Sequence, residues 1–132
     1  MDIEGITALI DSGDDAGALG HLLALVEREP AAEGAWLFLV GIGFRTNDPH
    51  LTLRAFRALE VFRPRDAFVA SGLVDCLLQL KQYEEARRVI NAFAEVAQAG
   101  NAVHETVLKE HRKALAFIDD RVSENIKGSD GS

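Results

Sequence analysis

The sequence has few of the residues that interrupt or cross-link a chain: three prolines, one cysteine, one tryptophan and one tyrosine among 132 residues. A single cysteine excludes an intrachain disulfide, so the simplest expectation is a reducing compartment, the cytoplasm. Little proline and little β-branched alternation, together with abundant Leu, Ala, Glu and Arg, predict an all-α protein. The length suits one domain.

Long apolar runs and excess positive charge are also missing. The longest apolar run, Ala35 to Val40, is too short to cross a bilayer, so we expect no stable membrane insertion. The formal net charge is −7, and an acidic chain repels phosphates, so we expect no nucleic-acid partner. Arginines such as Arg54 and Arg57 alternate with acids such as Glu60. We interpret them as a solvated face, with a nucleic-acid patch as the alternative.

A repeat of 34 residues is present in the spacing. Pro30 and Pro64 are 34 positions apart, and each follows a charged stretch typical of a helix. Three further columns match at this period: small residues at Ala18, Thr52 and Ala86, and apolar residues at Leu22, Phe56 and Ile90 and at Leu25, Leu59 and Phe93.

Each repeat reads as two helices joined by a short break. In the first repeat we expect a helix at about 2–11 and a second helix that ends at about 28. In the second repeat we expect a helix at 33–45 and a partner that ends at about 62, and in the third repeat helices at 67–80 and 83–98. Asp48 is the expected N-cap of the fourth helix, with Pro49 in its first position, and Asp66 is the expected N-cap of the fifth. Ala18 and Ala86 would allow close helix approach. The space inside the middle repeat would be filled by Trp36, Leu39, Phe56 and Leu59.

The last segment, about Ala102–Lys127, has a different pattern. Apolar residues recur there at steps of three and four with charged residues between them, which predicts a long amphipathic helix. Such a helix would cap the last repeat and complete one domain over residues 1–127. Residues 128–132 are rich in Gly and Ser, and we expect them to be disordered.

This pattern resembles the tetratricopeptide repeat (TPR), with repeats at about 1–32, 33–66 and 67–98. The middle repeat carries the signature residues Trp36, Leu39, Phe56 and Pro64, and the third carries Tyr83-Glu84-Glu85-Ala86. Val40 and Thr52 depart from it, because a small residue and alanine are usual there. The resemblance implies a solenoid of helical hairpins.

In such arrays the first helix of each repeat lines a concave groove that binds protein segments. By register, this partner-binding groove would comprise Ile3, Ile10, Leu37, Phe38, Gly41, Phe44, Phe68, Ser71, Asp75 and Leu78. The lining is largely apolar and lacks the basic clamp that grips acidic peptide tails, so it would accept apolar side chains. The absence of a side chain at Gly41 would let a ligand backbone approach. The alternative is that these aromatics belong to the core or are covered by a terminal helix.

No catalytic, cofactor or metal motif emerges from the residues. His104 and His111 could share a helix face, but two nitrogens without a third ligand make a weak zinc site, so we interpret both as surface or core histidines. Cys76 lies in an apolar helix and is expected to be a buried structural thiol. Gly41-Ile42-Gly43 lacks the strand and third glycine of a dinucleotide loop. We therefore expect no enzyme activity.

The runs Phe68–Gln79 and Tyr83–Ala86 resemble the last repeat of the class II chaperones of bacterial type III secretion, and residues 59–66 resemble repeat ends of related proteins. The resemblance, mainly in residues 56–95, implies a chaperone that keeps a secreted translocator, needle or export component soluble before export. Dimers are common in that family, so a homodimer is also implied. Two alternatives remain: a generic TPR scaffold or regulatory subunit, and an oligomer assembled through the C-terminal helix.

Overall fold

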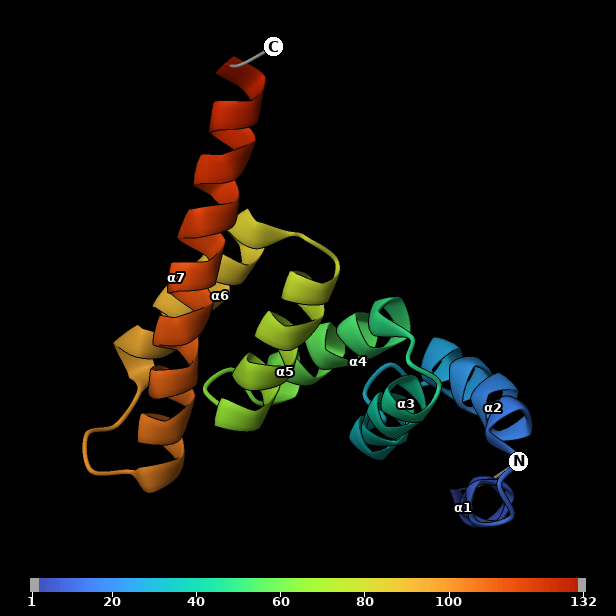
Figure 1. Ribbon diagram of the computed structural model, residues 1–132. Coiled ribbons are helices and arrows are strands. Elements are labelled where there is room, and N and C mark those ends of the chain that lie inside the picture. Colours follow the sequence, from blue (N-terminus) through green and yellow to red (C-terminus); the bar gives the residue numbers. More distant parts are fainter. Residues whose placement is uncertain (1–2, 131–132) are drawn as a thin grey trace. The chain divides into compact units, whose positions relative to one another are not determined.

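The protein is all-α in a computed structural model that describes the backbone of residues 3–130 and the side chains of residues 3–123. Within that range there are seven helices and no strand (Figure 1). They form two compact units, Met1–Pro64 and Arg65–Ser132. The first contains α1 (Ile3–Asp11), α2 (Asp15–Arg28), α3 (Glu33–Arg45) and α4 (Pro49–Phe62). The second contains α5 (Ala67–Gln79), α6 (Tyr83–Val96) and α7 (Ala102–Asp130).

Helix boundaries agree closely with those expected from the sequence, with three differences in the second unit. The helix predicted to reach Leu80 stops at Gln79 in α5. The helix predicted to reach Gln98 stops at Val96 in α6. The backbone of α7 remains helical to Asp130, past the predicted end at Lys127. Gly131 and Ser132, the last residues of the expected disordered tail, lie outside the described residues.

The 34-residue period of the sequence is also a period of the structure. The second helix of each pair begins at Asp15, Pro49 or Tyr83 and ends at Arg28, Phe62 or Val96, each 34 positions after its predecessor. The first helices α1, α3 and α5 end at Asp11, Arg45 and Gln79, again 34 apart. Each pair therefore folds to the same local plan.

The turn inside each pair is the most regular part of this plan. A residue with positive φ follows the first helix each time: Gly13 at 83°, Asn47 at 52° and Lys81 at 59°. The next backbone N–H donates to a carbonyl five residues earlier, at 2.8 Å in all three turns: Asp14 to Leu9, Asp48 to Gly43 and Gln82 to Leu77. This is the Schellman ending, which satisfies the free carbonyls of a helix and reverses the chain.

The helix that follows each turn begins at once, because the residue after the left-handed position is its N-cap. Asp14 Oδ1 accepts from Gly17 N at 2.9 Å, and Asp48 Oδ1 accepts from Leu51 N at 3.1 Å. Asp66 caps α5 in the same way, with its Oδ1 accepting from Val69 N at 3.0 Å. The predicted caps Asp48 and Asp66 and the predicted place of Pro49 are thus confirmed.

Ion pairs link the start of one helix to the end of the next, as expected for antiparallel neighbours. Arg45 at the end of α3 donates two hydrogen bonds to Asp15 at the start of α2, at 3.0 and 3.1 Å. Arg63 after α4 pairs with Glu33 at the start of α3. Both pairs are partly exposed to solvent, so they contribute little to stability and act mainly on helix orientation.

The core of the first unit lies between α3 and α4, and its predicted composition is confirmed. Trp36, Leu39, Phe56 and Leu59 are all buried. The Trp36 indole N–H donates to the Pro30 carbonyl at 2.9 Å, so the ring can be buried without an unpaired donor. The small residues that recur every 34 positions, Ala18, Thr52 and Ala86, are buried too.

Gly43 permits the crossing of α3 over α4. A Cβ at this position would lie 2.1 Å from Thr52 Oγ1 and 3.1 Å from the Thr52 backbone nitrogen. When the repeats are aligned at 34 residues, Thr52 takes the position that alanine occupies at 18 and 86. The residue that faces Thr52 is Gly43, whereas the equivalent positions 9 and 77 hold leucine. The larger residue on one helix is thus matched by the smallest residue on the other.

In the second unit, α7 packs against both α5 and α6. A buried cluster of Ala67 and Ala70 on α5 and Phe93 on α6 is flanked by partly buried Val107 and Leu108 of α7. Ile118, further along α7, is fully buried. The predicted amphipathic face of this helix therefore contributes to the core of the second unit. Within residues 3–130, no helix is both long and apolar enough to span a bilayer.

We expect Gly43→Ala to lower the free energy of unfolding by about 1–3 kcal/mol, because overpacking at Thr52 outweighs alanine's better helix propensity of about 1 kcal/mol. Urea unfolding measures the change. The control is Gly34→Ala in the same helix, where a Cβ meets nothing within 4 Å and the substitution should stabilise. Adding Thr52→Ala to Gly43→Ala should recover part of the loss, and strictly additive effects of the two changes would contradict the proposed match.

Candidate functional site

The predicted groove residues of α3 form an exposed strip along that helix. Leu37, Gly41 and Phe44 are spaced by four and three residues, which places them on one face, and Phe38 beside them is half-buried. Phe44 is 54% exposed, yet its ring meets the edge of the buried Phe56 ring at a centroid distance of 6.1 Å. The strip therefore offers an aromatic surface that is anchored on the core but open to a partner.

Gly41 lies within this strip, and no other helix in the described part of the chain crowds it. A Cβ there would meet only the guanidinium Nη1 of Arg45, at 3.2 Å, and this is the far end of a flexible side chain. The two glycines of α3 thus differ, because Gly43 is required by the α4 crossing and Gly41 faces open surface. Arg45 is itself held by Asp15, and the hydrogen bonds between them lower the pKa of the Asp15 carboxyl.

A second exposed strip follows α5 in the second unit. Phe68, Ser71, Asp75 and Leu78 are spaced by three and four residues and turn away from the buried face of the helix. Phe68 is 52% exposed, while Ser71 and Leu78 are half-buried. Partial desolvation raises the pKa of the Asp75 carboxyl, and the carboxylate of Glu110 on α7 raises it further.

On α1 the predicted residues also lie away from the core. Ile3 is exposed and Ile10 is half-buried, whereas Ile6 between them is fully buried. α1 packs against α2, which in turn packs against α3. The structure thus brings Leu37, Gly41 and Phe44 together on α3, whereas the α5 strip belongs to the second unit.

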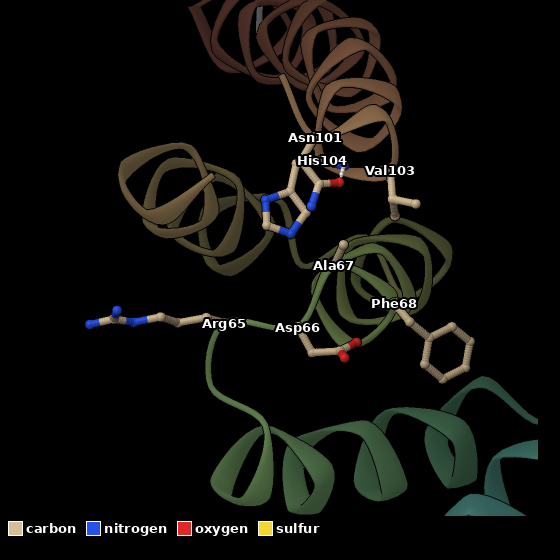
Figure 2. Close-up of a pocket in the computed structure, with 7 residues that line it drawn as sticks. All are labelled: Arg65, Asp66, Ala67, Phe68, Asn101, Val103 and His104. Carbon is tan, nitrogen blue, oxygen red and sulfur yellow. Dashed lines mark hydrogen bonds between the residues drawn. The ribbon is translucent and has the colours of Figure 1, made fainter. Parts of the chain in front are cut away.

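A hollow of about 300 Å³ lies in the second unit, where α5 and α7 begin (Figure 2). Of the residues around it, only Phe68 belongs to the groove that the sequence predicts for partner binding. The full lining is Arg65, Asp66, Ala67, Phe68, Asn101, Val103 and His104. The local signal for it in the sequence is the Gly100-Asn101 pair, which separates the apolar patterns of α6 and α7.

Most polar groups of this hollow already serve the helix starts. Asp66 caps Val69, and Asn101 Oδ1 accepts from His104 N at 3.1 Å (Figure 2). His104 Nδ1 accepts from Gln98 N at 2.9 Å, so the proton of the neutral ring lies on Nε2. The surface left for a partner is therefore largely apolar and comes from Phe68 and from Val103, which is 62% exposed.

The single cysteine is shielded from solvent. Burial raises the pKa of the Cys76 thiol to about 11, and the nearby Asp75 carboxylate adds to this effect. A protonated, buried thiol is a poor nucleophile, which agrees with the structural role predicted for Cys76. No group of three or more His, Cys, Asp or Glu side chains suited to a metal ion occurs in the described part of the chain.

We expect Asp75→Asn to raise the free energy of unfolding at neutral pH, because it removes a carboxylate disfavoured by partial burial and by Glu110. The folded pKa lies above the unfolded one, so this cost applies at high pH and disappears as the pH falls through the folded pKa. The increase in the free energy of unfolding should therefore shrink as the pH falls toward about 4, and urea unfolding at several pH values measures it. The exposed Glu95→Gln on α6 is the control, and a pH-independent gain in Asp75→Asn would argue against the Asp75–Glu110 interaction.

No model of a known protein family matches this chain, and no curated protein matches it either.

Proposed function

We propose that this chain is a TPR-like protein whose apolar strips hold a segment of another polypeptide, in the manner of a secretion chaperone. The observation that carries the proposal is the exposure of large aromatic side chains on the first helix of successive pairs, at Phe44 and Phe68. Burying one such side chain in a complex contributes about 1.5–3 kcal/mol. Exposed apolar surface of this kind typically marks a site of protein interaction.

The TPR-like part of the proposal is supported by the period of the helices. Helix starts, helix ends and left-handed turn residues recur every 34 residues, which is the length of a tetratricopeptide repeat. Pairs of this kind stack into arrays in which the first helices share one surface. The strips of α1 and α3 would lie on such a surface of the first unit, and the α5 strip on the corresponding surface of the second unit.

The capping role proposed for α7 is supported by its contacts. It packs against α5 and α6, and its apolar residues flank the buried cluster around Phe93. A repeat array needs such a helix, because its last repeat would otherwise expose an apolar face. Val103 at the start of α7 would extend the apolar surface next to Phe68.

The secretion role depends on the resemblance in residues 56–95. By that resemblance, the partner is a translocator, needle or export component, which a cytoplasmic chaperone keeps soluble by covering its apolar segment. A homodimer would fit the same family. A general TPR scaffold would use the same strips for a partner without any role in export.

We expect Phe44→Glu and Phe68→Glu each to weaken partner binding by about ten- to a hundredfold, because each removes an apolar contact and places a charge in the interface. The partner is first identified by mass spectrometry of what co-purifies with the chain from its native host. Its apolar segment is then made as a peptide, and its affinity is measured by calorimetry. Circular dichroism should show that both variants stay helical, since both side chains are more than half exposed.

The matched control is Val61→Glu, on α4 and outside the strips, where the side chain is 80% exposed. It should bind as the wild type does. Equal binding by all variants would refute the strips as the binding surface. A partner unrelated to secretion, bound through Phe44 and Phe68, would instead favour the scaffold.

A further inference from the structure

His111 is buried in the middle of the second unit although its ring is polar. It lies on α7 and is 3% exposed. Its ring meets the Phe93 ring of α6 edge-on at a centroid distance of 5.7 Å, and His104 meets the same phenylalanine at 5.4 Å. The imidazole is therefore part of the contact that holds α7 against α6.

Neither ring nitrogen of His111 has a hydrogen-bond partner among the described residues. A buried polar group without a partner already disfavours the folded state, and a buried charge without a counter-ion disfavours it far more. The neutral ring can be accommodated against Phe93, whereas the imidazolium would need to reach water. Burial accordingly lowers the pKa of His111, and the charge of Glu110 opposes this effect.

The charged and titratable groups of the helices packed around this contact offset the burial of an imidazolium only in part, because burial outweighs the charge of Glu110. On α7 the neighbour is Glu110, which is exposed. On α5 they are Asp75, whose pKa is raised in part by Glu110, and the buried thiol of Cys76. These acids lie toward solvent while the His111 nitrogens are buried.

On α6 the group that faces the ring is the apolar Phe93. The ion pair between α6 and α7, from Arg87 Nη2 to Asp119 Oδ1 at 2.8 Å, lies about two turns further along α7. It is partly exposed and ties the helices together without contributing to the His111 site. Residues 97–101 connect α7 to α6, whereas the contact between α5 and α6 is made within the preceding helix pair.

We propose that His111 makes the docking of α7 pH-sensitive, so that protonation of its ring in mild acid loosens α7 from α5 and α6. The folded pKa lies below the unfolded value, so the stabilisation of the docked state is complete above the ordinary histidine pKa and is lost as the pH falls below it. Asp75 changes stability with pH in the opposite direction. Its pKa is raised in the folded state, so acid removes the free-energy cost of its negative charge. The two residues can therefore be told apart by the direction of the pH effect.

Hydrogen exchange followed by mass spectrometry tests this on the full chain. The intrinsic exchange rates at each pH are divided by the observed rates for residues 106–118 of α7, which gives protection factors. Because each pH unit below about 6.5 favours the protonated, open form by up to tenfold, protection should fall by up to about 30-fold at about pH 5. In His111→Leu, protection should stay level or rise. Protection of α3 in the first unit should not follow the same course.

Two further variants keep the interpretation unambiguous. His111→Gln retains a polar side chain that does not titrate, and it should lose the acid response even if its protection at neutral pH is lower. His50→Leu, at an exposed histidine of α4, should keep the wild-type response. An unchanged acid response in both His111 variants, or its loss in His50→Leu, would overturn the proposal.

Discussion

The reversal between paired helices is the constraint on which the rest of the structure depends. Gly13, Asn47 and Lys81 each adopt a left-handed conformation, and the residue after each donates to a carbonyl five positions back. This turn fixes where the first helix ends, and the capping residue fixes where the second begins. With both ends set, the small residues of the second helix reach the partner helix in register, and the outer face of the first helix stays exposed.

Within this frame, complementary size decides how closely two helices approach. Thr52 is larger than the alanine of its column, and Gly43 opposite gives it room. The contact lies on the inner side of α3, whereas Leu37, Gly41 and Phe44 lie on its outer side. Packing and partner binding thus use different faces of one short helix. This division explains how α3 can be apolar on nearly every side and still leave aromatic surface free.

Local signals predicted much of the fold, because caps, turns and the 34-residue period act within a few residues of the chain. Asp48, Pro49 and Asp66 mark helix starts that the structure confirms. The match of Gly43 to Thr52 and the contact of His111 with Phe93 escaped prediction, because both depend on how one helix is rotated against another. The hollow beside Phe68 was missed for the same reason, since Val103 and His104 come to it from a different helix.

The agreement of helix boundaries across repeats has an evolutionary consequence. A segment such as 33–66 contains both halves of its own helix contact, including Gly43 and Thr52, together with its turn and its N-cap. Recombination at equivalent positions would transfer this matched set intact, whereas a crossover inside the hairpin would separate the glycine from the threonine that requires it. Lineages could therefore gain or lose whole hairpins more readily than they could exchange single helices.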